Sequence, residues 1–297
     1  MISQERYKKI LGKDFDSISK SFVAGRTSIR TNSLKISSED LKKKLENKGW
    51  SLEVLKFYED GFFLNTVDNP SKTIEHSLGY YFIQNASSMV PPLVLDPKED
   101  EIILDLAASP GAKTTEIAMI MKNNGAIIAN DIRHDRIKAL RGNIQRCGVV
   151  NTVVTKTWGE GYYKTGLKFD KILIDAPCSA TGLFSPRILK STSENTLRTL
   201  SNIQRRILSS AAQMLNKDGI LVYSTCSLEP EENEANIDYA EKNLNLQPEE
   251  IKIKGLDFQH PLKEWDNSKF SPGASFSVRI IPSEQMEGFF VCKMRKF

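Results

Sequence analysis

The sequence predicts an α/β protein with a doubly wound sheet, preceded by a small α+β unit at its amino end. From about residue 86 onward, short apolar runs alternate with amphipathic segments of helix length, which is typical of a parallel sheet with helices on both faces. Polar residues directly follow several of these runs, and open α/β sheets place their ligand sites at such strand ends. Before residue 86 the signals do not alternate in this way. We therefore expect two domains, residues 1–85 and residues 86–297.

The composition is that of a globular protein. The chain has 297 residues, of which 40% are hydrophobic and 26% are charged, and this length suits one large domain with a smaller partner. No apolar run approaches the roughly 20 residues that a membrane helix needs, so we expect a cytoplasmic protein with no membrane partner. The net charge of +4 permits nucleic-acid binding but does not require it.

The cysteines and histidines show no metal-binding pattern. The four cysteines are widely separated without a C-x-x-C pair, and the three histidines are scattered. We therefore predict no metal site and no disulfide framework. Cys147 lies on a helical apolar stripe and Cys292 lies within a predicted strand, so we expect both in the core.

The amino-terminal unit has one helix signal among several extended segments. A helix start is indicated at residues 37–40, where serines and acidic residues precede an amphipathic stretch. Residues 28–35 and 51–58 are predicted to be extended. Residues 60–61, Asp-Gly, are typical of a hairpin turn.

The larger domain is predicted from its apolar runs and the helices between them. The predicted strands are residues 102–104, 126–129, 171–174, 220–223 and 288–293. Three helices are indicated by apolar residues at helical spacing, namely Ile117, Ile120 and Met121, then Ile137, Leu140, Ile144 and Cys147, then Leu197, Leu200, Ile203, Ile207, Leu208, Ala211 and Leu215. Residues 247–277 have no such pattern, so we expect a surface loop there.

The turn after the first of these strands, residues 105–114, consists of small residues and leads into a helix. Such a turn lets backbone N–H groups approach a ligand closely. Its end resembles the phosphate-binding loop G-x-x-x-x-G-K-[ST], but Ala107 and Ala112 replace both glycines, which disfavours nucleotide triphosphate hydrolysis. Asp131 ends the second strand, where folds that bind nucleoside cofactors place a ribose-binding carboxylate, although a helix cap explains it equally well. A nucleoside without a pyrophosphate cradle suggests S-adenosylmethionine.

Two cysteines directly follow predicted strands. Cys178 lies in residues 175–182 behind Asp175, and Cys226 lies between the last parallel strand and the acidic residues 230–234. Either thiol alone could simply pack in the core. Two thiols at strand ends on the same side of a parallel sheet are harder to explain by packing. We expect residues 230–234 to begin a helix that fixes the direction of Cys226.

Together these motifs resemble those of the Fmu/Sun (nucleolar protein/Sun) family of RNA cytosine-5 methyltransferases. The turn is similar to the family's D-x-C-A-A-P-G-G-K-T. The other matching segments are residues 30–35, 81–88, 175–182, 223–234 and 279–290, with Asp131, Arg136, Leu140, Asn143, Arg146 and Gly148 at the family's spacing. The resemblance spans nearly the whole chain and is closest to the compact archaeal-type transfer RNA enzymes.

The resemblance implies a Rossmann-like, S-adenosylmethionine-dependent methyltransferase fold with a small RNA-recognition-like amino-terminal domain. It implies that Cys226 is the nucleophile and that Cys178 assists elimination and product release. Asp175 would stabilise the protonated nitrogen 3 of the base, and Lys113 would orient the base and this carboxylate. The residues implied for S-adenosyl-L-methionine are Ala107, Ala108, Ser109, Pro110, Gly111, Ala112, Lys113, Asp131, Arg136, Glu160 and Asp175.

The cofactor region departs from the family pattern in two places. Ala107, Ser109 and Ala112 replace Cys, Ala and Gly of the turn, which would alter the affinity for the cofactor. Where the family usually has an aspartate near the adenine, this chain has Trp-Gly-Glu-Gly at residues 158–161. Glu160 would serve there with a longer reach.

The expected partner is RNA, with transfer RNA favoured over ribosomal RNA. The chain has neither the extra amino-terminal helical domain nor the long carboxyl-terminal extension that ribosomal RNA enzymes of the family often carry. One alternative is therefore methylation of ribosomal RNA. Another is a catalytically silent RNA-binding or assembly factor on the same scaffold, although retention of both thiols, Asp175 and Lys113 argues against it. We expect a monomer without a metal ion.

Overall fold

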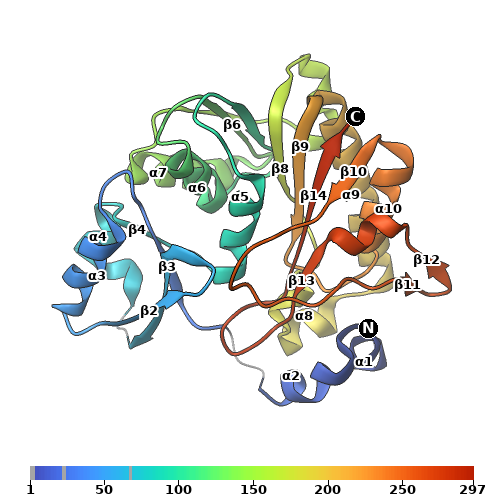
Figure 1. The fold of residues 1–297 in the computed structure, drawn as a ribbon, viewed down its shortest axis with the longest axis horizontal. Coiled ribbons are helices and arrows are strands. Elements are labelled where there is room, and N and C mark those ends of the chain that lie inside the picture. Colours follow the sequence, from blue (N-terminus) through green and yellow to red (C-terminus); the bar gives the residue numbers. More distant parts are fainter. Residues whose placement is uncertain (1–3, 22–24, 67–68) are drawn as a thin grey trace.

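A computed structural model describes residues 4–21, 25–66 and 69–297, which form a small sheet beside a large one (Figure 1). The small sheet has the strand order β2–β3–β1–β4. Its strands and helices are β1 (Ser28–Thr31), α3 (Ser38–Glu46), β2 (Ser51–Leu55), β3 (Tyr58–Thr66), α4 (Ile74–Ser77) and β4 (Tyr81–Ile83). The side chain of Ser37 caps α3 by accepting a hydrogen bond from the Asp40 amide. Leu41 and Leu45 of α3 pack on the sheet, as an amphipathic helix should.

The hairpin of the small sheet turns at residues 56–57, because Leu55 pairs with Tyr58 across it. The prediction of a turn at residues 60–61 was therefore wrong. Both residues lie inside β3, where a Cβ on Gly61 would lie only 2.4 Å from Leu55 Cδ1. The absence of a side chain at Gly61 lets Leu55 pack directly against the β3 backbone, and close approach of this kind is a common reason for glycine within a strand.

The large sheet has the strand order β10–β14–β9–β8–β5–β6–β7, with β13 paired to β14. Strands β5 to β9 run parallel, whereas β14 is antiparallel to β9 and to both β10 and β13. The bounds are β5 (Ile102–Asp105), β6 (Ala126–Asn130), β7 (Thr152–Thr155), β8 (Phe169–Asp175), β9 (Leu215–Thr225), β10 (Leu246–Glu249), β13 (Val278–Ile280) and β14 (Phe289–Lys296).

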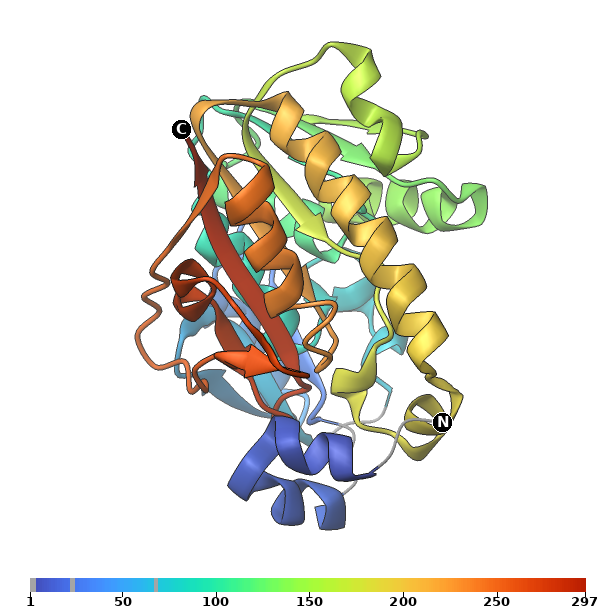
Figure 2. The same ribbon diagram turned by 90° about the vertical axis from the view of Figure 1, so that its right-hand side faces the viewer.

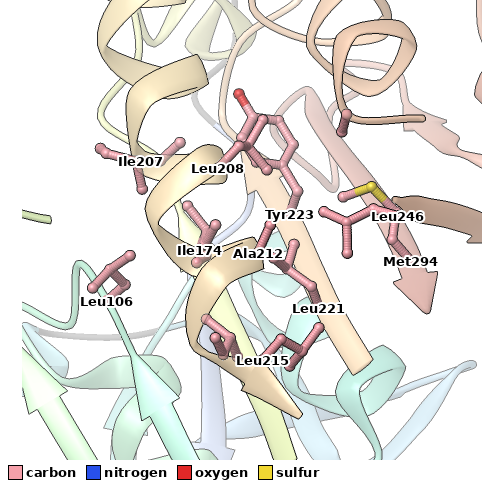
Figure 3. Packing of buried hydrophobic residues seen from close by; sticks show 14 of the residues in the cluster. Leu106, Ile174, Ile207, Leu208, Ala212, Leu215, Leu221, Tyr223, Leu246 and Met294 are labelled. Carbon is pink, nitrogen blue, oxygen red and sulfur yellow. The ribbon is translucent and has the colours of Figure 1, made fainter. Parts of the chain in front are cut away.

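Helices cover both faces of this sheet (Figure 2). They are α5 (Val90–Leu95), α6 (Ala112–Ile120) and α7 (His134–Cys147) on one face, and α9 (Glu194–Met214) and α10 (Glu234–Asn243) on the other. Successive strand residues alternate between the faces: Ile172 and Ile174 lie in the cluster with α9, whereas Leu173 lies in the cluster with α5 and α6. Figure 3 shows Ile207, Leu208 and Ala212 of α9 over the β8 and β9 side chains. The prediction of a doubly wound sheet is confirmed.

The stretch predicted to be a surface loop is partly structured. Residues 246–249 form β10 at the edge of the large sheet, so the prediction was wrong for the first residues of 247–277. The remainder includes a small hairpin of β11 (Glu264–Trp265) and β12 (Ser268–Lys269). Among the described residues, the 3₁₀ helices are η1 (Gly12–Asp14), η2 (Pro70–Lys72), η3 (Ala86–Met89), η4 (Gly159–Thr165), η5 (Thr181–Leu183) and η6 (Pro272–Phe276).

The first two helices lie away from the small sheet, beside α8 (Pro186–Ser191), as Figures 1 and 2 show. In α1 (Gln4–Leu11) and α2 (Phe15–Ser21), an apolar side packs against Phe184 and Leu228. The Tyr7 hydroxyl donates to Glu229 Oε1 at 2.7 Å. The amino end of the chain thus supports the segment that follows β9. Within the described ranges, no helix combines the length and apolar character needed to cross a bilayer.

Candidate active site

The residues predicted to carry chemistry lie where the parallel strands of the large sheet end. Asp105 ends β5, Asp131 follows β6, Asp175 ends β8, and Cys226 follows β9. Because β5, β6, β8 and β9 are parallel neighbours, their carboxyl ends meet at one edge. Open α/β sheets place ligand sites along such an edge.

The structure brings the two predicted thiols together. The sulfur atoms of Cys178 and Cys226 lie 3.3 Å apart, and both side chains are half-buried. The hydrogen bond with Cys226 and burial raise the pKa of the Cys178 thiol well above its ordinary value, with further contributions from the charges of Cys226 and Glu232. Either sulfur atom can donate the hydrogen bond between them. Cys147 and Cys292 are 1% and 0% exposed, which confirms that they belong to the core.

The two thiol-bearing loops approach closely because of a glycine. The amide of Gly182 donates to the carbonyl of Cys226 at 2.9 Å, and the amide of Gly288 donates to the carbonyl of Gly182 at 2.9 Å. A Cβ on Gly182 would lie 2.1 Å from the Gly288 carbonyl oxygen, so a larger residue would push the loops apart. In addition, Thr181 Oγ1 accepts a hydrogen bond from the Leu228 amide at 3.0 Å.

An ion pair adjoins the thiols. Lys113 Nζ lies 2.6 Å from Asp175 Oδ2 and also donates to Ser88 Oγ at 2.9 Å. The other carboxylate oxygen of Asp175 accepts from Ser224 Oγ at 2.9 Å. Lys113 is 7% exposed and its ammonium group lies 5.3 Å from the ring centre of Phe289. The carboxylate is thus fixed in one orientation, with a third of its side chain still open to solvent.

The predicted cofactor turn is held to the end of β6. Gly111 has a φ of 103°, a left-handed conformation that favours glycine. The Ser109 amide donates to Asp131 Oδ2 at 3.3 Å, and Arg136 Nε lies 3.6 Å from the same oxygen. Asp131 Oδ1 accepts from the Arg133 amide at 3.0 Å just before α7. This bond closes a local turn and does not cap the helix, because the N-cap residue of α7 is Arg133 and no side chain caps it; the capping interpretation of Asp131 was therefore wrong.

A cavity of about 410 Å³ connects this turn to the thiols. Its apolar walls include Leu106, Ile132, Trp158, Ile203 and Ile207. Of the predicted site residues, the ones that line it are Ala107, Asp131, Arg136, Glu160, Asp175, Cys178 and Cys226. The remaining predicted cofactor residues, Ala108, Ser109, Pro110, Gly111, Ala112 and Lys113, complete the turn without being among its lining residues. Glu160 Oε1 lies 3.6 Å from Arg206, so its carboxylate already has a partner.

These residues fit a nucleoside cofactor. One end of the cavity offers the Asp131 carboxylate for ribose hydroxyls, and apolar walls suit an adenine ring. Asp105 is fully buried beside the turn. Thr114 donates to its Oδ2 at 2.6 Å, but its Oδ1 has no hydrogen-bond partner among the described residues. Such an orphaned oxygen suits a site that a bound polar ligand completes.

Two important residues were missed by sequence reasoning. Asn130 ties the loop after β5 to the loop before Trp158, because its Nδ2 donates to the Leu106 carbonyl and its Oδ1 accepts from the Thr157 amide at 2.9 Å. Glu232 is 0% exposed and contacts both thiol-bearing loops. Asparagine at a strand end and glutamate in an acidic run are common on surfaces, so a single sequence carries no signal for either role.

The helix predicted to begin in residues 230–234 begins only at the last of them. Residues 230–233 form turns, and α10 begins at Glu234. The glutamates of this segment are buried and bonded instead of capping a helix: Glu229, Glu232 and Glu234 are each 0% exposed. In the part of the chain that the structure describes, no group of three or more His, Cys, Asp or Glu residues is arranged to hold a metal ion.

Two family models match the chain. Residues 92–295 match the model described as 16S rRNA methyltransferase RsmB/F, and residues 4–86 match the model for the N-terminal domain of 16S rRNA methyltransferase RsmF. Two solved structures from Pyrococcus horikoshii are similar over 99% of this chain. One, a methyltransferase homolog protein, has a TM-score of 0.89 at 34% identity and is 94% covered. The other, NSun6 with SFG, has a TM-score of 0.85 at 27% identity and is 97% covered.

Curated relatives agree with these matches. A tRNA (cytosine(49)-C(5))-methyltransferase of Pyrococcus abyssi is 39% identical over 91% of this chain and 88% of its own length. A 28S rRNA (cytosine-C(5))-methyltransferase of Mus musculus is also 39% identical over 91% of this chain, but over only 35% of its own length. The resemblance and the Rossmann-like methyltransferase fold inferred from the motifs are confirmed. The chain belongs to the RsmB/F (Fmu/Sun) family of RNA cytosine-5 methyltransferases.

Proposed function

We propose that this RNA cytosine-5 methyltransferase acts on transfer RNA, uses S-adenosyl-L-methionine, and bonds covalently to the base through Cys226. The observation that carries the proposal is the pair of strand-end thiols 3.3 Å apart, next to the Lys113–Asp175 ion pair and in the same cavity as Asp131.

The two thiols suit the two halves of the reaction. Carbon 5 of cytosine is a poor nucleophile, so a thiolate must first add to carbon 6, which gives an enamine whose carbon 5 can attack a methyl donor. When bound, S-adenosylmethionine supplies that electrophilic methyl group. A water molecule from solvent then accepts the proton from carbon 5, the electrons of that C–H bond restore the double bond between carbons 5 and 6, and the bond between carbon 6 and the Cys226 sulfur breaks. Cys226 performs the addition. Cys178, whose pKa is raised by its hydrogen bond with Cys226 and by burial, gives its proton to the departing Cys226 sulfur and so assists the elimination.

The ion pair next to the thiols positions and activates the base. Addition of a thiolate to carbon 6 places negative charge on the ring, and protonation at nitrogen 3 compensates it. Asp175 holds that proton at nitrogen 3, and Lys113 keeps the carboxylate oriented from 2.6 Å away. Ser224 fixes the second oxygen of Asp175, so the acceptor is preorganised before the base arrives.

The cofactor is held by the turn and by the opposite end of the cavity. The residues in this role are Ala107, Ala108, Ser109, Pro110, Gly111, Ala112, Lys113, Asp131, Arg136, Glu160 and Asp175. Asp131 binds the ribose hydroxyls. Glu160 or its neighbour Trp158 takes the place of the family's adenine-side aspartate, because both line the cavity.

The substrate base must leave its stack to reach this site, which costs a few kcal/mol within a duplex. Structured RNA with a cytosine in a loop or junction lowers that cost. The small sheet and α3 provide a second surface for the RNA beside the catalytic edge (Figure 1). Transfer RNA is favoured because the Pyrococcus abyssi relative, 39% identical over 91% of this chain, is a tRNA (cytosine(49)-C(5))-methyltransferase.

The test is methyl transfer from labelled cofactor to separated transfer and ribosomal RNAs, followed by mapping of methylated cytosines. The proposal expects label in transfer RNA, with position 49 as the first cytosine to inspect, and none with Cys226→Ser. Label in ribosomal RNA alone would show that ribosomal RNA, and not transfer RNA, is the substrate. No label in either RNA, with intact cofactor binding, would indicate a silent RNA-binding factor and overturn the proposal.

A further inference from the structure

Glu232 is a buried carboxylate without a cation. The acidic segment after Cys226 contains three glutamates that are 0% exposed. Glu229 pairs with Arg6 and Glu234 pairs with Arg279, whereas Glu232 forms no ion pair with any residue that the structure describes. Burying a charge without a counter-ion is costly. Retaining such a group between the two thiol-bearing loops points to a role beyond stability.

Glu232 is satisfied by neutral donors from both thiol-bearing loops. Its Oε1 accepts from the backbone amide of Ser179 at 3.0 Å, and its Oε2 accepts from the hydroxyls of Ser179 and Ser227. Ser179 directly follows Cys178, and Ser227 directly follows Cys226. Gln204 of α9 donates to Oε1 at 3.0 Å and to the Pro177 carbonyl at 2.8 Å. One carboxylate therefore connects the residues next to both sulfur atoms.

The position of the carboxylate is itself fixed. The Glu232 carbonyl accepts from the Tyr223 hydroxyl at 2.6 Å and from Asn236 Nδ2 at 3.0 Å. Tyr223 is a β9 residue and is fully buried in the core under α9 (Figure 3), and Asn236 lies in the first turn of α10. The connection between the loops thus rests on the rigid sheet and on α10.

We propose that Glu232 is a positioning residue that joins the Cys178 loop to the Cys226 loop and sets the separation of the two thiols. The inference rests on the proposed roles of Cys226 and Cys178. The carboxylate acts through the adjacent serines and through its charge and does not touch the base.

The electrostatics of the crevice agree with this role. The titratable groups that face Cys178 are Cys226, Glu232 and Tyr223, with the Lys113–Asp175 pair at the end of β8. After the hydrogen bond with Cys226 and burial, the charge of Glu232 contributes to raising the pKa of Cys178. Burial raises the pKa of Glu232 as well, while its four donors oppose that shift.

The test compares Glu232→Gln with Glu229→Gln, an equally buried glutamate of the same segment that contacts α1. An amide cannot accept all the hydrogen bonds that Glu232 accepts, so the loops lose their common anchor. For Glu232→Gln we expect kcat to fall about 100-fold, as for a displacement of about 1 Å, with KM for RNA unchanged. Glu229→Gln should keep kcat within threefold.

A second measurement needs no substrate. In a Cys226→Ser background, the rate of Cys178 alkylation by iodoacetamide is followed against pH by peptide mass spectrometry. Adding Glu232→Gln should lower the midpoint of that profile by about one pH unit, and adding Glu229→Gln should leave it in place. If Glu232 only supported the structure, Glu232→Gln would change the maximal alkylation rate of Cys178 and not the pH midpoint of the profile.

The proposal is overturned if Glu232→Gln keeps kcat within threefold, or if both glutamine variants lose activity and thermal stability together while the midpoint stays fixed. If the wild-type protein methylates no RNA, the proposed function fails, and the alkylation midpoint still decides whether Glu232 controls Cys178.

Discussion

The sulfur atoms of Cys178 and Cys226 lie 3.3 Å apart although 48 positions separate the residues in the sequence. The two thiols are chemically identical, but their surroundings differ. Cys178 follows the strand that ends in Asp175, and its pKa is raised, whereas Cys226 follows β9 and presents its carbonyl to Gly182. A pair with one retained proton can divide nucleophilic attack and elimination between its members.

If Cys226 attacks the base and Cys178 assists elimination, replacing each cysteine by serine should give opposite results. Cys226→Ser should abolish methyl transfer, because a hydroxyl is too weak a nucleophile for carbon 6. Cys178→Ser should retain attack but fail in release, so that an RNA–protein adduct accumulates and migrates slowly on a denaturing gel. Cys147→Ser, in the core, serves as a control and should form no adduct. An adduct with Cys226→Ser instead would mean that the two roles are exchanged.

The second prediction concerns the ion pair of Lys113 and Asp175. Asp175→Asn should lower kcat by roughly 10²–10⁴-fold, the usual range for loss of an acid–base group. Lys113→Met should have a similar effect, and the double variant should be little worse, because residues that act as a unit are not additive. Steady-state kinetics at saturating RNA and cofactor measure this.

Lys171→Met is the matched control for that experiment. Lys171 pairs with Glu101 at 3.1 Å near the amino end of the same strand, so its loss removes a comparable ion pair far from the thiols. It should lower thermal stability with kcat preserved. Equal losses of kcat in Lys171→Met and Lys113→Met would show that the ion pair matters only for the stability of β8.

The sequence predicted that Asp131, Asp175 and Cys226 lie together because each is at, or directly after, the end of an apolar strand. In a parallel sheet all such ends share one edge, so Asp131, Asp175 and Cys226 had to converge once the strands were placed. The two core cysteines were identified by the same local periodicity. These inferences need only the order of the strands and their direction.

The residues that were missed depend on contacts between distant segments. Tyr7 reaches Glu229 across 222 positions, and the burial of Glu232 requires α9, α10 and both thiol loops to be in place. No local pattern distinguishes these buried glutamates from exposed glutamates in the first turn of a helix. At residues 60–61 the local signal was misleading. The Asp-Gly dipeptide is typical of a hairpin turn, but here the glycine is needed because a side chain would collide with Leu55.

The third prediction uses Trp158, which is 67% exposed at the cavity. S-adenosylhomocysteine should change the tryptophan fluorescence, and Trp158→Phe should remove that change and weaken binding by up to about tenfold, the contribution of an aromatic contact. Trp50 packs in the small sheet and Trp265 lies beside Arg6, so Trp50→Phe and Trp265→Phe should keep the signal. Calorimetry measures the affinity independently. An unchanged signal in Trp158→Phe, with binding intact, would place the adenine elsewhere.

The last prediction concerns the dependence of folding stability on pH. Burial raises the pKa of Asp105 from 3.8 to about 7, opposed by the hydrogen bond from Thr114 and the charge of Lys113. Between pH 4 and 7 the folded protein therefore keeps a proton that the unfolded chain has lost. The contribution of Asp105 to stability falls as pH rises through this window and is constant above it.

Asp105→Asn, which cannot ionise, isolates this contribution. The free energy of unfolding of the wild-type protein minus that of the variant should decrease between pH 4.5 and 7.5, by on the order of 1–4 kcal/mol. Urea denaturation at several pH values measures the difference. Asp257→Asn, at an exposed position, should show no such trend. A difference between wild type and Asp105→Asn that stays constant with pH would mean that Asp105 is ionised in the folded protein, its buried charge compensated by Lys113 and Thr114.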